Sequence, residues 1–181
     1  MAAPNSLGYV VVDGVEGQIR GASLVVDARG IPLDFRYTDP IRPTKLERVL
    51  YGSALDTYLR EELVLQSLLG AVETRPQMWL CNELDLLVPL RTIGKIKTIF
   101  LTPSSHAPLD AVGHIEPTSE PEVLLLQADA VSAPLRMAFP AGSRPDEAQQ
   151  AVALLVEAAK TMELLEPFGR VQKALAAVGE D

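Results

Sequence analysis

The hydrophobic positions in the first part of the chain alternate in the way that is typical of a small antiparallel sheet. A β-branched run at 9–12, a longer run at 18–26 and the alternating segment 33–37 predict three strands. Turn-forming residues separate these strands at 13–17 and 27–30, where glycines can adopt a positive φ. We therefore expect the fold to begin with an antiparallel meander.

Helical periodicity follows a proline-rich segment that ends the meander. Thr44 and Glu47 have the spacing of a capping box, which predicts the start of a helix. Leucines recur on one stripe of a longer amphipathic helix at 56–72. The short apolar run 78–81 predicts a buried strand after this helical region.

The middle of the chain holds a short helical segment and a further strand. Residues 83–88 predict about one turn of helix, which Pro89 should end. Residues 95–101 alternate again and predict a strand, with Lys95 and Lys97 on the same face. We expect this strand to lie at an edge of the sheet, because exposed lysines protect sheet edges from aggregation.

A long loop and a second group of elements complete the chain. Residues 102–121 contain four prolines and both histidines, and loops of this length are functional or mobile in most proteins. Two strands are expected at 123–126 and 135–139. A helix over 143–166 and a short final helix over 168–178 should follow.

These elements predict an α+β fold of antiparallel β-meanders and hairpins packed with helices. The chain should form a single domain over 1–181. Its candidate sub-units are 8–101 and 122–181, joined by the loop 102–121. The segments 24–63 and 124–164 show the same succession of elements, which favours two repeated β-hairpin–helix units around one core.

Composition and charge restrict the function classes. Hydrophobic residues form 48% of the 181 residues, enough for an ordinary globular core. The net charge of −8 disfavours nucleic acid as a partner, because phosphates repel an acidic surface. A single cysteine, Cys81, excludes an intrachain disulfide and favours a cytoplasmic location. Residues 1–6 lack the pattern of a signal peptide, and we expect no membrane contact.

Two groups of side chains are candidate metal sites. His106 and His114 in the loop could bind a metal ion with Cys81 and Glu116, but their spacing matches no standard zinc site. A metal-dependent hydrolase built on the loop 102–121 therefore stays an alternative. Two solvated loop histidines are the simpler interpretation, so we expect no metal and no cofactor.

A second arrangement of carboxylates matches a ribonuclease H-like nuclease. That chemistry places acids on a first strand, a helix and a later strand, where they hold two metal ions. Asp13, Glu62 and either Glu83 or Asp85 follow this order. However, Asp13 stands in a predicted turn and the net charge is negative, so this interpretation is disfavoured. We assign no catalytic residues, because no nucleophile elbow or phosphate-binding glycine motif is present.

The densest basic cluster consists of Arg91, Lys95 and Lys97. It is interpreted in two ways, as protection of a sheet edge or as a groove that binds an acidic peptide. In the second interpretation these three residues are the candidate peptide-binding site.

Part of the sequence resembles a known family. The stretch 24–36 reads LVVDARGIPLDFR, and with Pro43, 50–52 and 163–168 it is similar to uncharacterised proteins from myxobacteria and planctomycetes. The size of the chain also resembles the small peptide-binding proteins of the crocagin pathway, which help to modify a ribosomally made precursor peptide. Neither resemblance assigns a role to a residue.

Together these patterns favour a non-catalytic accessory protein that binds a peptide or protein partner. The resemblance implies a role in natural-product biosynthesis, with a ribosomal precursor peptide as the partner. The alternatives are the metal-dependent hydrolase and a structural subunit that buries its helices in a homo-oligomer.

Overall fold

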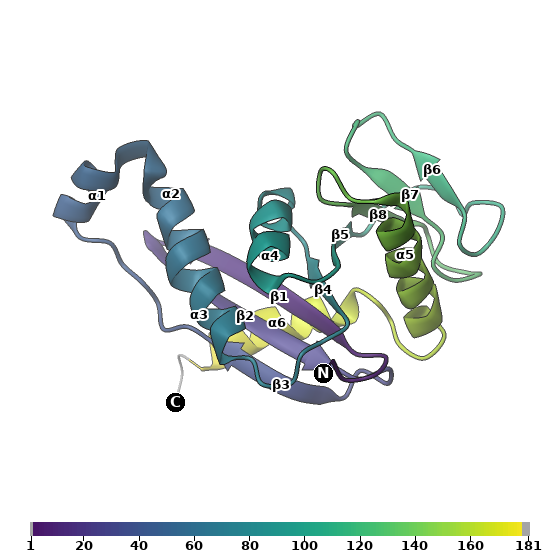
Figure 1. Cartoon of the computed structure of the whole chain (residues 1–181), viewed down its shortest axis with the longest axis horizontal. Helices are drawn as coiled ribbons and strands as arrows, with labels where there is room; N and C mark the ends of the chain where they lie inside the picture. Colours follow the sequence, from purple (N-terminus) through teal and green to yellow (C-terminus); the bar gives the residue numbers. More distant parts are fainter. Residues whose placement is uncertain (1, 179–181) are drawn as a thin grey trace.

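Within residues 2–178, which the computed structural model describes, the chain forms one mixed sheet of eight strands with helices on both faces (Figure 1). Across the sheet the strands follow the order β3-β2-β1-β4-β5-β8-β7-β6. Their bounds are β1 (Leu7–Val15), β2 (Gln18–Val26), β3 (Pro32–Tyr37), β4 (Met78–Cys81), β5 (Thr98–Thr102), β6 (Ile115–Pro117), β7 (Leu124–Leu126) and β8 (Leu135–Ala138). The prediction of an α+β fold is confirmed.

The helical elements lie in three stretches of the chain, between β3 and β4, between β4 and β5, and after β8. Their bounds are α1 (Lys45–Tyr51), η1 (Gly52–Ala54), α2 (Leu55–Thr57), η2 (Tyr58–Leu65), α3 (Gln66–Ala71), η3 (Leu84–Leu86), α4 (Leu87–Gly94), α5 (Pro145–Ala159) and α6 (Glu166–Ala177). The capping box at the start of α1 is confirmed, because the Thr44 hydroxyl accepts from the Glu47 amide at 3.1 Å and the Thr44 amide donates to the Glu47 carboxylate at 3.0 Å. No helix among the described residues has the length and apolarity needed to cross a membrane.

The antiparallel meander is present, but its first turn lies later than predicted. β1 and β2 pair antiparallel and reverse at Glu16 and Gly17, which have φ values of 53° and 76°. Asp13 therefore lies inside β1, directly opposite Arg20 on β2, and not in a turn. The strand continues because nothing before Glu16 interrupts the pairing of the two backbones.

β4 and β5 make the sheet mixed, which the local pattern did not predict. β4 pairs in parallel with both β1 and β5. A parallel neighbour requires a crossover connection. β2, β3 and the helices from α1 to α3 lie between β1 and β4, and η3 and α4 lie between β4 and β5. Every residue of β4 is buried, as expected for a strand that is covered on both faces.

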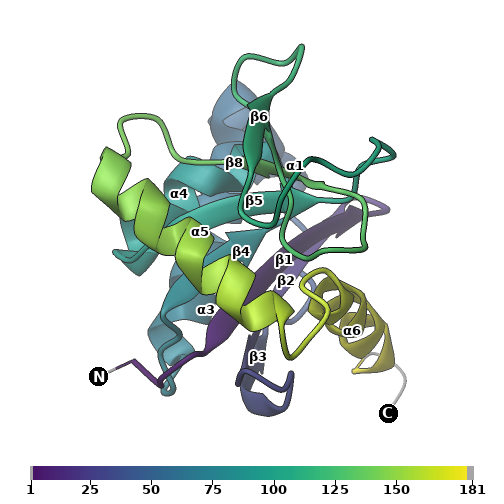
Figure 2. The same cartoon turned by 90° about the vertical axis from the view of Figure 1, so that its right-hand side faces the viewer.

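Helices cover both faces of this sheet (Figures 1 and 2). On one face, η2, α3 and α4 pack their apolar side chains against Val10 and Val12 of β1. On the other face, α6 packs against β1, and α5 contributes to the same apolar core, which includes Tyr9 and Val11. Because successive side chains of a strand point to opposite faces, β1 contributes to both cores in strict alternation.

Two prolines lie inside helices, at positions where the sequence predicts that a helix ends. Pro89 lies in the first turn of α4, where its missing N–H has no intrahelical partner to lose. Pro167 similarly lies in the first turn of α6, so the predicted helix over 143–166 ends at Ala159 instead. Both predicted stops were wrong because proline is as compatible with the start of a helix as with its end.

The loop 102–121 is shorter than predicted, because β6 lies within it and pairs with β7. The segments 24–63 and 124–164 each contain a hairpin followed by a helix, β2–β3–α1 and β7–β8–α5. The sheet runs without a break through both candidate sub-units. A true duplication and the division into sub-units stay predictions.

Candidate functional site

The carboxyl ends of β1 and β4 form one edge of the parallel part of the sheet, the position at which open α/β sheets bind ligands. Asn82 and Glu83 follow β4 directly. From the neighbouring helix η2, Arg60 donates from Nη1 to Glu83 Oε2 at 2.8 Å and from Nε to Asp56 Oδ1 at 3.3 Å. We call Arg60, Glu83 and Asp56 the carboxyl-edge cluster.

The helix that presents Arg60 has an unusual geometry. η2 is a π-helix of eight residues, and π-helical segments occur frequently at functional sites. Val64 of η2 lies so close to β2 that a Cβ added to Gly21 would clash with its side chain. The glycine thus allows η2 to approach the sheet and places Arg60 above the end of β4.

Charge and partial burial reinforce the carboxyl-edge cluster. The side chain of Arg60 is 25% exposed and that of Glu83 is 41% exposed. Burial lowers the pKa of the Arg60 guanidinium, but the hydrogen bond and the charge of Glu83, with a further contribution from Asp56, outweigh it and raise the pKa above its usual range. Arg60 therefore presents a permanent positive charge beside a carboxylate that water can reach.

Asp13 lies at the same end of the sheet but on its other face. Its carboxylate is 3.6 Å from Arg20, and Arg20 also donates to the Leu175 carbonyl of α6 at 2.9 Å. Alternation along β1 places Asp13 on the side of α6, whereas Glu83 faces η2. The acids of the ribonuclease H-like hypothesis are therefore not gathered, since Glu62 and Asp85 are exposed and neither forms an ion pair with a described residue.

A preformed metal site is also absent from residues 2–178, because no three His, Cys, Asp or Glu side chains lie close enough to hold an ion. His106 contacts the Ala107 carbonyl, while His114 is 3.2 Å from Glu116. Cys81 is buried, and burial raises its pKa to about 12, so the thiol stays protonated. The loop ligands that the hydrolase alternative required are thus not brought together.

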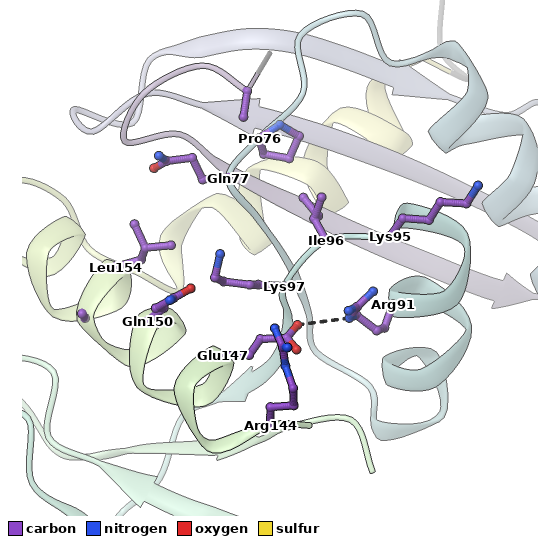
Figure 3. A pocket seen from close by; sticks show the side chains of 12 residues that line it. Pro76, Gln77, Arg91, Lys95, Ile96, Lys97, Arg144, Glu147, Gln150 and Leu154 are labelled. Carbon is purple, nitrogen blue, oxygen red and sulfur yellow. Dashed lines mark ion pairs between the residues drawn. The ribbon is translucent and has the colours of Figure 1, made fainter. Parts of the chain in front are cut away.

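The opposite edge of β4 and β5 carries a groove of about 770 Å³, which we call the amino-edge groove (Figure 3). The predicted binding residues Arg91, Lys95 and Lys97 all line it. Glu147 of α5 and Arg144, which precedes that helix, face them, and Glu147 lies 3.2 Å from Arg91. This ion pair joins α4 and α5, which cover opposite faces of the sheet.

The lysines do not lie on a strand edge, so that part of the prediction was wrong. Lys95 ends α4 in a left-handed conformation with φ 61°, and Lys97 precedes β5. β5 lies between β4 and β8 inside the sheet. Protection of a sheet edge is therefore not their role. Arg144 was missed because it is distant in sequence, and only the packing of α5 brings it to the groove.

One wall of the groove is the loop 72–77, which Asp34 of β3 holds in place. The Asp34 carboxylate accepts from the backbone amides of Glu73 at 2.9 Å and Thr74 at 3.0 Å, and from Arg36 Nε at 2.9 Å. Burial raises the pKa of Asp34, but these three hydrogen bonds outweigh it and hold the pKa below its usual range. The ionised carboxylate thereby fixes the loop that carries Pro76 and Gln77 into the groove.

Comparison with solved structures identifies proteins of the same architecture. Endonuclease V from Streptomyces avermitilis matches 96% of this chain and 82% of its own length, with a TM-score of 0.55 and 15% sequence identity. Endonuclease V from Bacillus subtilis matches 83% of this chain and 71% of its own, with a TM-score of 0.52 and 15% identity. Endonuclease V from Ciona intestinalis, solved with a 23mer DNA that contains an inosine, matches 96% and 86%, with a TM-score of 0.55 and 10% identity.

No family model and no curated protein sequence matches the chain. The structural matches nevertheless correct three expectations. A non-catalytic, peptide-binding role in natural-product biosynthesis was wrong, as were the exclusion of enzymatic activity and the exclusion of nucleic acid, because the similar structures are nucleases and one of them is bound to DNA. At 10–15% identity the matches establish the architecture itself, and the chain has the fold of endonuclease V.

Proposed function

We propose that this protein is a hydrolase that acts on nucleic acid and cleaves a phosphodiester bond at the carboxyl-edge cluster. The observation that carries the proposal is the Arg60–Glu83 pair at the end of β4, in a chain with the fold of endonuclease V. Ligand sites lie at this end of the strands in related sheet architectures. The cytoplasmic location that the lone cysteine favours is part of the same proposal.

The side chains of the cluster supply two of the functions that phosphodiester hydrolysis needs. Arg60 can bind a phosphate oxygen through a charge-assisted hydrogen bond and stabilise the negative charge that develops as water attacks. Glu83 is a carboxylate acceptor that can orient the attacking water and take its proton. As the new bond to phosphorus forms, the bond to the leaving sugar oxygen breaks, and that oxygen takes a proton from solvent water. Their separation of 2.8 Å means that both groups can contact one phosphate and its attacking water.

A pair of metal ions, which many nucleases use, does not fit the acidic residues at this end of the sheet. Two-metal catalysis requires carboxylates that converge on the ions. Asp13 and Glu83 instead face opposite sides of the sheet, and no three metal-binding side chains converge among the described residues. The chemistry above is therefore derived from Arg60 and Glu83 alone, and no step is assigned to a metal ion.

The negative net charge does not argue against a nucleic-acid substrate. Charges act locally, because a Debye length of about 8 Å at physiological salt screens more distant groups. Arg60 supplies the positive charge of the carboxyl-edge cluster, and the acidic residues of the loop 102–121 are carried by another part of the sheet.

A cleavage assay with end-labelled oligonucleotides tests the proposal. Purified protein is incubated with single-stranded and duplex DNA and RNA, some containing inosine, in Mg²⁺, in Mn²⁺ and in chelator. We expect cleavage of at least one substrate, and Glu83→Gln should slow it by about 100-fold or more. Glu163→Gln removes an exposed carboxylate from a distant loop and serves as the matched control. Absence of cleavage, or equal activity of Glu83→Gln, would contradict the proposal.

A further inference from the structure

We propose that the amino-edge groove binds the sugar-phosphate backbone of a nucleic-acid strand. The inference rests on the proposed function for the identity of the ligand, but it concerns a different surface of the molecule. Figure 3 shows the groove between α5 and the segment that joins α4 to β5, with Arg91 and Glu147 facing each other across it.

Positive charge is concentrated in this groove although the protein as a whole is acidic. Four cationic side chains line it, from Arg91, Lys95, Lys97 and Arg144, and Glu147 is the acid among the described lining residues. A second hollow of about 470 Å³ shares Pro76, Lys95 and Ile96 with the groove and adds Arg75. The two hollows adjoin at these three shared residues, and we call the five cations that line them the basic track, in a chain whose net charge is −8.

The cations of the track retain free donors. Lys95 and Lys97 form no ion pair with any described carboxylate. Arg91 contacts Glu147 through Nε, and a guanidinium has further N–H groups for another acceptor. The side chain of Arg144 is 76% exposed and lies 3.6 Å from that of Asp146, which is 62% exposed. An incoming anion would therefore meet several donors without first breaking a buried ion pair.

The shape of the track favours an extended polyanion over one small anion. Five cations are distributed along two joined hollows, so a single phosphate could contact only part of the set. Trp79 is the aromatic residue among the described lining side chains and is only 4% exposed, which leaves no platform for stacking a base. Contacts to phosphates, which carry no base sequence information, are what this chemistry provides.

The position of the track relates it to the proposed active site. β4 with one residue at either end spans about 20 Å at the rise of an extended strand. The groove lies at the beginning of this strand and the carboxyl-edge cluster at its end. A strand held in the groove would thus be anchored away from the bond that is cleaved, so groove contacts should affect affinity and not the chemical step.

Fluorescence anisotropy with a labelled 20-nucleotide oligodeoxythymidylate tests the inference in chelator, where binding is measured without added metal. With about four phosphate contacts, raising the salt from 50 to 200 mM should weaken binding about 50-fold. Combining Lys95→Gly with Lys97→Gln removes two contacts, which should weaken binding about 25-fold at 0.1 M salt and halve the salt dependence. Thermal unfolding checks that the variant is folded, and Lys95→Gly with Arg144→Gln is a second pair for the same comparison.

The matched control combines Lys160→Gln with Lys173→Gln, which changes the net charge equally at exposed positions outside the groove. We expect its affinity to stay within about twofold of the wild type. Equal weakening by the control pair would overturn the inference, since the effect would then reflect net charge alone. Displacement of the oligonucleotide by polyglutamate at the same charge concentration would also overturn it, in favour of an acidic peptide.

The same assay separates this inference from the proposed function. If the protein binds through the groove but cleaves nothing, the proposed hydrolase is wrong and the groove assignment stands. If it cleaves but both groove pairs bind normally, the groove assignment is wrong and the hydrolase stands.

Discussion

At the carboxyl end of β4, positive and negative side chains are paired with each other, whereas at its amino end two lysines have no described carboxylate partner. Arg60 contacts both Glu83 and Asp56, and Arg20 contacts Asp13 on the other face. In the amino-edge groove, Lys95 and Lys97 have no described carboxylate partner. The two ends of β4 thus differ in whether the nearby cations are already paired with a carboxylate or are free to contact a phosphate.

This difference indicates that the two edges have different functions, one in the chemical step and one in binding the strand. A paired arginine and carboxylate are oriented by each other, which suits them to act on one defined phosphate. Lysines without a partner have flexible side chains, so they can contact the phosphates of a nucleic-acid backbone at many positions along it. Four substitutions, taken from the largest expected effect to the smallest, test this comparison.

Replacing Arg60 should have the largest effect. Arg60→Gln removes the charge proposed to stabilise the phosphate and leaves Glu83 without its partner. We expect cleavage to slow by about 100-fold or more, because loss of one preorganised donor has effects of this size. Arg60→Lys keeps the charge and should recover part of the rate. Single-turnover rates measure both variants, and an unchanged rate in Arg60→Gln would remove the arginine from the chemistry.

Gly21→Ala tests whether the close approach of η2 builds the carboxyl-edge cluster. The added methyl would overlap the Val64 side chain and push η2 away from β2. We expect a loss of about 1–3 kcal/mol in the free energy of unfolding, measured with urea. Gly169→Ala in α6 meets open space and is the matched control, with a gain of up to about 1 kcal/mol. Equal effects of the two substitutions would contradict the packing argument.

Asp34→Asn tests the support of the amino-edge groove and its dependence on pH. Because the pKa of Asp34 is lowered in the folded protein, its contribution to stability is present above the ordinary carboxyl pKa of about 4 and is lost as the pH falls through the lower folded value. Wild type should exceed Asp34→Asn by about 1–3 kcal/mol at pH 7. Urea unfolding at pH 7 and pH 3 should show this advantage shrinking in acid, and a difference independent of pH would contradict the role of the charge.

Lys95→Gly should have the smallest effect on stability and the opposite sign. Lys95 adopts a left-handed conformation at the end of α4, with its amide donating to the Arg91 carbonyl at 2.9 Å. Glycine has no Cβ to strain this backbone, so we expect a gain of about 1 kcal/mol in the free energy of unfolding. Weaker oligonucleotide binding in a more stable protein would separate the charge of the groove from its fold. A less stable Lys95→Gly would show that the lysine stem supports the packing.

Local sequence predicted the features that depend on neighbouring residues. The capping box of Thr44 and Glu47, the antiparallel meander and the clustering of Arg91 with Lys95 and Lys97 all follow from residues close together in the chain. The turn glycine Gly30 also adopts the positive φ that its context required.

Features that depend on distant contacts could not be predicted in this way. The parallel pairing of β4 with β1 needs a long crossover, and nothing within 78–81 distinguishes a parallel from an antiparallel partner. Arg60 and Glu83 are 23 residues apart and meet only because η2 packs over the end of β4. The glycine after Asp13 favours a turn there, and only the pairing of β1 with β2 shows that Asp13 lies in a strand and faces α6.

Steady-state cleavage kinetics of three proteins test whether the carboxyl-edge cluster performs the chemical step and the amino-edge groove binds the substrate. Wild type, Glu83→Gln and the pair Lys95→Gly with Lys97→Gln are compared on the same oligonucleotide. We expect Glu83→Gln to lower kcat by about 100-fold or more with KM nearly unchanged. The pair Lys95→Gly with Lys97→Gln should raise KM by about 25-fold with kcat unchanged. A fall in kcat for the groove pair as large as that for Glu83→Gln, or an unchanged kcat in Glu83→Gln, would contradict the division between the two edges.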